Sequence, residues 1–351
     1  MRKVAVSGIP ASRLFSALTA VVYLNGLCPL AWNMKMPCLY PSCIPPEPEL
    51  HMPPFTGLSA FPITPAAANG TVDLANLGRL LDRLVAANVD SIGLLGSTGT
   101  YAYLSHQERM RATAFAADQI GEACPLIVSI GTIRTDDARR LAEHAASAGA
   151  AGLLMAPVSY TPLTNDEVFA HYKAVAETTD LPLCIYDNPS TTHFTFSTDL
   201  FARLATIPNV KGVKTLVADE IEAHLGALRA MLPADFQIGY SGDWGCADAL
   251  AAGADAWFSV VAGVLPQPGV ALARAAMRGD LTEVSRINTL LRPLWDLFRQ
   301  HGSLRVAYGI AHQRGLTGHD LPRPLLPLGK NDQAQIAKAL VDLEQISPPA
   351  P

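Results

Sequence analysis

Two hydrophobic patterns alternate along the chain from residue 57 onward. Short apolar or β-branched runs recur, and between them apolar residues return every three or four positions. The short runs are typical of buried strands, and the longer spacing is typical of one face of a helix. Residues 73–87 show the helical spacing most clearly, with leucine or valine at six such positions. Strands are expected at the runs GLSAFPI, SIGLLG, PLIVSIG, AGLLMAP, LPLCIYD, VKGVK, FQIGYSG and AWFSVV.

Strands that alternate with helices pair in parallel. Eight such units over about 220 residues predict an α/β fold, a closed (β/α)8 TIM barrel. A doubly wound open sheet is the alternative, but its first strand usually leads into a glycine-rich phosphate-binding turn. Here the first strand ends in FPITP, which cannot form that turn.

The end of the chain has a different pattern. Helical spacing alone is present at 281–301, 304–314 and 331–346. This pattern predicts a small C-terminal helical domain at 280–347, packed on a catalytic barrel at 52–279.

Helix starts are marked by residues that can bond free backbone N–H groups. Ser105 and Thr164 are each followed three residues later by a glutamate, which fits the capping box. Thr135 and Ser197 place a hydroxyl and nearby aspartates at two more predicted starts.

The first 51 residues differ in composition from the rest. A charged start at Arg2 and Lys3 precedes the apolar stretch LFSALTAVVYL, an order that occurs in signal peptides. However, Leu27 stands before Cys28, where a cleavage site needs a small residue. We expect residues 1–51 to be an N-terminal extension, either disordered or a start-site artefact, with a targeting segment as the alternative.

Composition narrows the class of protein. The chain is 49% hydrophobic and 16% charged, which supplies a large core and argues against disorder. The net charge of -5 comes without a basic stripe, so no nucleic-acid partner is expected. No apolar run approaches the ~20 residues needed to cross a membrane. The six cysteines form no C-x-x-C pair, and the nine histidines show no H-E-x-x-H spacing. We therefore expect a reduced, cytoplasmic protein without a metal or cofactor.

Polar residues follow four of the predicted strands. In a (β/α)8 barrel the active site gathers at the carboxyl ends of the strands, so these segments can converge on one cavity. They are Gly96-Ser97-Thr98-Gly99, Tyr186-Asp187-Asn188-Pro189, Lys214-Thr215 and Ser241-Gly242-Asp243.

Lys214 is the most informative of these residues. It closes the strand run VKGVK, where a lysine would project into the barrel mouth. Removal from water favours the neutral form of an amine, which can attack a ketone and form an imine. A solvated loop lysine is the alternative interpretation. Lys211 is a second candidate nucleophile, but it should lie nearer the start of the strand.

Two further segments suit the same chemistry. Gly96, Ser97 and Thr98 offer hydroxyl and backbone N–H donors that can hold a carboxylate, although an ordinary strand-to-helix turn uses the same residues. Tyr186 ends the fifth strand, where a phenol can relay protons. A tyrosine at a strand end can equally be structural.

Together these motifs resemble the dihydrodipicolinate synthase and N-acetylneuraminate lyase family. The resemblance rests on GSTG after strand two, YDNP after strand five and GVK at strand six, and spans about residues 55–345. It implies that Lys214 is the Schiff-base lysine, that Tyr186 relays protons, and that Ser97 and Thr98 hold a keto acid carboxylate. It also implies a homo-oligomer, a dimer or a tetramer. Tyr160 loosely matches a second tyrosine that the family often contributes across a subunit interface.

The sequence departs from that family's synthases at three places. Thr100 stands where a glutamate is usual after the GSTG-type turn, and Thr215 stands where synthases carry glutamate after the lysine. Thr191, Thr192 and His193 occupy a segment in which synthases place an arginine. An arginine would hold the carboxylate of aspartate semialdehyde with two hydrogen bonds.

These departures bear on the second substrate. Thr191 suits a hydroxylated partner, so we predict a lyase that cleaves or dehydrates a 2-keto-3-deoxy sugar acid or a related compound. The alternative is a dihydrodipicolinate synthase, if another arginine such as Arg134 reaches the site. A catalytically idle ligand-binding barrel and a metal-dependent aldolase are further alternatives. Intact Lys214 and Tyr186 argue against the first, and the missing ligand cluster argues against the second.

Overall fold

The computed structural model describes residues 54–346, so the predicted extension at residues 1–51 lies outside the described residues. Within the described part, eight parallel strands close into a barrel in chain order, with β8 paired to β1. The (β/α)8 barrel predicted from the hydrophobic pattern is confirmed. The strands are β1 (Gly57–Ala60), β2 (Ser91–Leu94), β3 (Leu126–Ser129), β4 (Gly152–Met155), β5 (Leu183–Tyr186), β6 (Val210–Leu216), β7 (Gln237–Ser241) and β8 (Ala256–Ser259).

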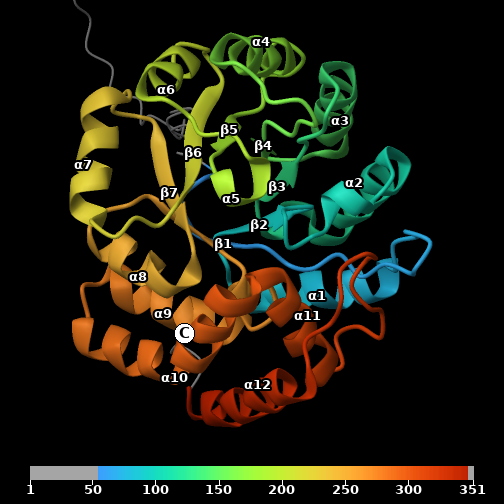
Figure 1. The fold of residues 1–351 in the computed structure, drawn as a ribbon, viewed down its shortest axis with the longest axis vertical. Coiled ribbons are helices and arrows are strands. Elements are labelled where there is room, and N and C mark those ends of the chain that lie inside the picture. The colour runs from blue at the N-terminus through green and yellow to red at the C-terminus, as the bar shows by residue number, and fades with distance from the viewer. Residues whose placement is uncertain (1–53, 347–351) are drawn as a thin grey trace, which may run out of the picture. The chain divides into compact units, whose positions relative to one another are not determined.

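Helices surround the strands, which occupy the centre of Figure 1. Each strand is followed by at least one helix, and the segment after β5 forms two short ones. The helices of the barrel are α1 (Leu74–Ala86), α2 (His106–Ile120), α3 (Thr135–Ala148), α4 (Asn165–Ala176), α5 (Pro189–Thr192), α6 (Thr198–Leu204), α7 (Ile221–Met231), α8 (Asp243–Ala251) and α9 (Pro266–Met277).

The core has two parts. A small inner cluster fills the barrel with side chains such as Phe55, Phe61 and Phe258. A larger cluster lies between the strands and the helices, and it continues into the C-terminal helices. The same cluster contains Tyr186, so aromatic rings form much of the floor of the barrel mouth.

The C-terminal segment is helical, as its spacing predicts. It forms α10 (Leu281–His301), α11 (Ser303–Gln313) and α12 (Lys330–Asp342), and α10 packs on α8 and α9. Gly302 alone separates α10 from α11, with a φ of 79° that favours glycine. The chain therefore turns sharply there, which brings the first turn of α11 to the pocket described below.

The four predicted helix starts are confirmed, and α3 begins at Thr135 itself with two aspartates in its first turn. Thr164 and Glu167 form the full capping box. Ser105 and Ser197 each accept a bond from a backbone N–H of the first helical turn. The capping box predicted at Ser105 is only half formed, because the Glu108 carboxylate accepts from the Val72 N–H and from Arg111 instead. Thr135, however, does not cap α3, because its hydroxyl bonds Nδ1 of His171 at 2.9 Å. None of the helices in residues 54–346 is long and apolar enough to span a membrane.

Candidate active site

Lys214 and Tyr186 are neighbours at the barrel mouth. They are direct partners in the register of the adjacent parallel strands β5 and β6. Residues paired in this way point to the same face of a sheet, here the inside of the barrel. Lys214 is only 6% exposed, and Tyr186 is buried beside it. The sequence therefore correctly predicted that these two strand ends converge.

Aromatic rings enclose the Lys214 amine. Its Nζ lies 4.2 Å from the centre of the Phe61 ring, 4.7 Å from that of Tyr186 and 5.7 Å from that of Phe258. None of these three residues carries a carboxylate, and their rings occupy these sides of the amine. An amine in such a place is accessible from the pocket alone.

The Tyr186 hydroxyl is the centre of a hydrogen-bond network. It lies 2.9 Å from the Ser97 hydroxyl, 3.3 Å from the Asn188 side-chain nitrogen and 3.5 Å from the Thr191 hydroxyl. Burial acts to raise the pKa of Tyr186, but the positive charge of Lys214 and these hydrogen bonds outweigh it, so the pKa is lowered from its ordinary value. The phenol is therefore suited to exchange protons.

The GSTG turn packs against the same aromatic floor. A Cβ at Gly96 would lie 2.5 Å from the ring of Phe61, so a larger residue cannot fit there without displacing that ring. Ser97 and Thr98 follow and line the pocket that contains Lys214. The turn thus places two hydroxyl-bearing residues in the pocket that contains the amine.

The main pocket has a volume of about 380 Å³ and extends from Lys214 outward to the C-terminal helices. This size falls in the usual range for small-molecule sites. Its inner end is formed by the strand ends, and its outer end by Trp244 of α8, Arg299 of α10 and the start of α11. Small polar residues also line the pocket, which are Asn188, Ser190, Thr191, Ser241 and Ser303.

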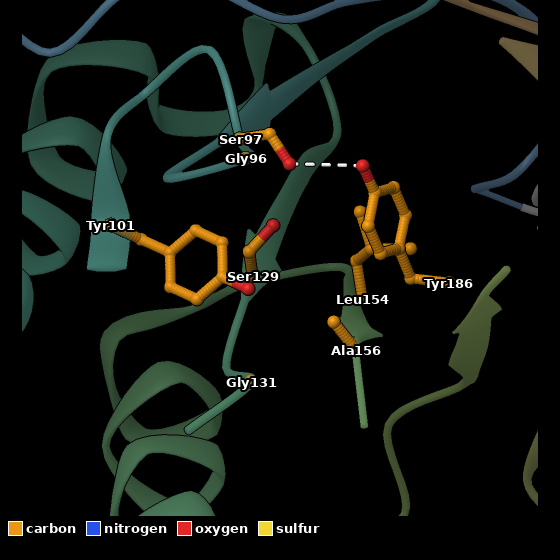
Figure 2. Close-up of a pocket in the computed structure, with 8 residues that line it drawn as sticks. All are labelled: Gly96, Ser97, Tyr101, Ser129, Gly131, Leu154, Ala156 and Tyr186. Atoms are coloured by element: carbon orange, nitrogen blue, oxygen red, sulfur yellow. Dashed lines mark hydrogen bonds between the residues drawn. The ribbon is translucent and has the colours of Figure 1, made fainter. Parts of the chain in front are cut away.

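A second, narrow pocket lies on the other side of Tyr186. Figure 2 shows Tyr101 and Tyr186 on opposite sides of it, with Ser97 bonded to Tyr186 and Ser129 nearby. Burial raises the pKa of Tyr101 above its ordinary value. Tyr101 is thus a second phenol beside Tyr186, and it lies outside the motifs that the sequence displays.

Arg109 is hydrogen-bonded to the backbone that lines this pocket. It is 2% exposed and donates to the backbone oxygens of Ser129 and Gly131 at 2.9 and 3.0 Å. Its guanidinium carbon lies 5.1 Å from the ring centre of Tyr101. Burial lowers the pKa of Arg109 to about 10. The sequence could have pointed to Arg109, because this charged residue shares the buried, apolar face of α2 with Ala112 and Ala116.

Polar residues near the lysine are engaged in hydrogen bonds within the protein, and one of them, Thr215, is a departure noted in the sequence. The Thr215 hydroxyl donates to Oδ2 of Asp187 at 3.0 Å, so this hydroxyl links the ends of β5 and β6. Burial raises the pKa of Asp187, and this hydrogen bond opposes the rise. Asp243 lines the main pocket, but its carboxylate accepts from the Ser259 hydroxyl and the Val261 N–H at 2.7 and 3.0 Å.

Several other candidate residues lie elsewhere. Tyr160 is 94% exposed and lines neither pocket, so a role across a subunit interface stays a prediction. Arg134 lies on the surface within 4 Å of Asp136 and Asp137, and it does not reach the main pocket. Lys211 pairs with an exposed aspartate at 3.1 Å, away from the mouth. Among the described residues, no three histidine, cysteine, aspartate or glutamate side chains gather as a metal site.

A lysine and a tyrosine side by side at the mouth of a (β/α)8 barrel, next to a turn of hydroxyls, define a lyase of the class I aldolase type, in which a lysine forms a Schiff base. The comparisons identify the family. The profile of the dihydrodipicolinate synthetase family matches residues 54–343, so the chain belongs to that family.

Individual relatives agree with this assignment. The chain is 33% identical over 280 residues to a 4-hydroxy-tetrahydrodipicolinate synthase of Nitrosospira multiformis, a match that covers 79% of this chain and 92% of the relative. It is 50% identical to the solved structure of a dihydrodipicolinate synthase from Agrobacterium tumefaciens, with a TM-score of 0.81 over 82% of this chain and 98% of that one. A structure titled a putative dihydrodipicolinate synthetase, from Pseudomonas aeruginosa, matches with 30% identity and a TM-score of 0.77, over 82% of this chain and 99% of that one.

Proposed function

We propose that Lys214 forms the Schiff base with pyruvate or another 2-keto acid, and that Tyr186 moves the protons. The observation that carries this proposal is the register pairing of the two residues inside the barrel mouth. Ser97 and Thr98, beside the amine, would hold the carboxylate next to the keto group. The lowered pKa of Tyr186 supports proton acceptance by its phenolate.

The reaction follows from these positions. Attack of Lys214 Nζ on the keto carbon C2 expels the keto oxygen as water and leaves an iminium. The C3–C4 bond then breaks, its electron pair forms an enamine, and the proton of the C4 hydroxyl passes to Tyr186. The aldehyde leaves, Tyr186 returns the proton to C3, and water hydrolyses the imine to free pyruvate and the amine.

The substrate proposed is a 2-keto-3-deoxy sugar acid or a related compound. The lining of the pocket supports this choice, because its serine, threonine and asparagine side chains can exchange hydrogen bonds with sugar hydroxyls. Dehydration is the variant in which the C3 proton and the C4 hydroxyl leave as water, with no C–C bond broken.

Synthesis of 4-hydroxy-tetrahydrodipicolinate is the second candidate function. The names of relatives about 30% identical to this chain favour it. The synthase segment that carries arginine has Thr191 here instead, which favours the sugar acid. A comparison of kcat/KM decides between them. A higher value for condensation of pyruvate with aspartate semialdehyde than for pyruvate release from every sugar acid tested would assign the synthase reaction.

Borohydride trapping tests the lysine itself. Pyruvate and borohydride should add a pyruvate-derived mass to the peptide that contains Lys214. Lys211→Met should keep the adduct, because Lys211 lies near the opposite end of β6, whereas Lys214→Met should lose it. If folded wild-type protein gives no adduct with any of several 2-keto acids, the Schiff-base assignment is wrong.

Assembly and compartment are part of the proposal. A homo-oligomer, dimer or tetramer, is expected from the family resemblance, and Tyr160 would then lie at a subunit interface. A cytoplasmic location is proposed from the cysteine pattern and agrees with the free, buried thiols of Cys124, Cys184 and Cys246.

A further inference from the structure

The outer end of the main pocket carries a positively charged side chain that the proposed chemistry does not use. Arg299 lies in the last turn of α10 and lines the same pocket as Lys214. Its guanidinium carbon lies 5.3 Å from the ring centre of Trp244, which limits where the group can point. The neighbouring Asp296 is 3.8 Å away, and both side chains are more than half exposed, so this ion pair is weak.

The first turn of α11 lies next to Arg299 in the same pocket. Gly302, Ser303 and Leu304 line it, and Gly302 has no side chain that could cap the helix. The first turn contains no acidic residue. The N–H groups at a helix start carry partial positive charge and bind anions. The His301 oxygen, at the end of α10, accepts from Arg305 at 3.2 Å, which offsets the opposite charge there.

Arg299 has the weakly paired Asp296 beside it, but no free carboxylate competes for it among the residues that line the pocket. Among the described residues that line it, Asp243 is the one acidic side chain, and its oxygens are bonded to Ser259, Val260 and Val261. Lys214 and Arg299 are the two cationic ones. The pocket therefore has a basic side chain at each end, and apart from Asp243 its other polar side chains are uncharged amides and hydroxyls.

We infer that Arg299 and the first turn of α11 bind a second carboxylate, at the end of the substrate farthest from the keto group. This inference rests on the proposed function, and it names the substrate class as dicarboxylic 2-keto-3-deoxy sugar acids. A guanidinium can hold a carboxylate with two parallel hydrogen bonds, and the N–H groups of α11 can bond a remaining lone pair. Arg299 is then a specificity-determining residue.

Two 2-keto acids of equal length test the inference without any cleavage step. The probes are 2-oxoadipate, which ends in a second carboxylate, and 2-oxohexanoate, which ends in a methyl group. Each is trapped on Lys214 with borohydride over a range of concentrations. We expect half-saturation at a concentration about tenfold lower for 2-oxoadipate, since exposed charge-assisted hydrogen bonds are of that strength. Arg299→Ala should remove this preference, and Arg299→Lys should keep part of it.

Arg292→Ala is the matched control. Arg292 is an exposed arginine two turns earlier on α10 that does not line the pocket, so the variant removes the same charge from the same helix. It should keep the wild-type preference. The inference is overturned if the wild type shows no preference for 2-oxoadipate, or if Arg299→Ala weakens the trapping of both probes equally. It is also overturned if Arg292→Ala changes the preference as much as Arg299→Ala does.

Failure of the proposed function would look different. In that case no 2-keto acid would be trapped on Lys214. Calorimetric binding of adipate and hexanoate would then test the role of Arg299 by itself, and equal affinities for the two would contradict the proposed carboxylate site. Aspartate semialdehyde also ends in a carboxylate, so its condensation with pyruvate is assayed in the same variants. An Arg299-dependent loss confined to that reaction would overturn the sugar diacid as the substrate class.

Discussion

At the inner end of the main pocket, strands position the groups proposed to react. At the outer end, the side chains that line the pocket come from helices and the junction between two of them. Lys214 and Tyr186 are paired in the register of β5 and β6, and both are buried. Arg299 and Trp244 belong to α10 and α8, more than 50 residues apart, and Arg299 is 54% exposed. A shift of the strands would move both inner groups together, while the outer groups can change one at a time.

This difference suggests a division of roles. Chemistry needs reacting atoms held within a few tenths of an ångström, and a barrel strand supplies that rigidity. Recognition of the far end of a substrate tolerates more movement and more exposure to water. Changes at the inner end should therefore lower turnover, and changes at the outer end should alter substrate preference.

Tyr186→Phe should give the largest effect among the changes that keep the lysine. It removes the hydroxyl at the centre of the inner network and leaves the ring against Lys214. We expect kcat to fall by roughly 100-fold or more, the scale of a positioned proton-transfer group. Steady-state release of pyruvate measures it, and unchanged circular dichroism would show that the fold is intact.

Tyr240→Phe is the control for this change. Tyr240 is equally buried on β7, but its hydroxyl bonds Nδ1 of His224 at 2.9 Å on the outer face of the barrel. Its removal should leave kcat within a few-fold of wild type. A near-normal rate in Tyr186→Phe would make Tyr186 a structural residue.

The inner end was also the part that the sequence could predict. Strand runs, helical spacing and the rule that barrel sites lie at carboxyl strand ends brought Ser97, Tyr186 and Lys214 together before any coordinates. The strands alternate inward and outward residues, so a position in the strand also indicates its face. Thr98 was predicted for the same reason and lines the pocket.

The outer end could not be predicted in the same way. Arg299 occupies an exposed position on an amphipathic helix, where arginine is ordinary, and its place at the pocket follows from the packing of α10 on α8 and α9. Arg134 follows a strand and was the arginine that the sequence offered, yet it lies on the surface near two aspartates. Tyr101 lies in a short 3-10 helix after the GSTG turn, a conformation that the spacing did not indicate.

The charge of Lys214 should be measurable through its neighbour. In the wild type the ammonium favours the phenolate of Tyr186, while burial opposes it. Lys214→Met removes the favourable charge and keeps the burial, so the pKa of Tyr186 should rise. The pKa is measured by a pH titration of tyrosinate absorbance. The same titration with Tyr186→Phe added to the wild type and to Lys214→Met assigns the change to Tyr186. Superimposable titrations would mean that the two groups do not interact electrostatically.

Trp244→Leu should give the smallest effect and act on the outer end alone. The substitution removes the ring that lies against the Arg299 guanidinium and leaves the inner end unchanged. A cation–π contact at an exposed site contributes about 0.5–1 kcal/mol, which corresponds to a rise in KM of roughly two- to fivefold for a dicarboxylic substrate. The kcat should stay the same, because no reacting atom moves. Trp244→Phe retains an aromatic ring and should show less of the rise. A fall in kcat with unchanged KM would place Trp244 with the reaction chemistry and contradict the division between the two ends.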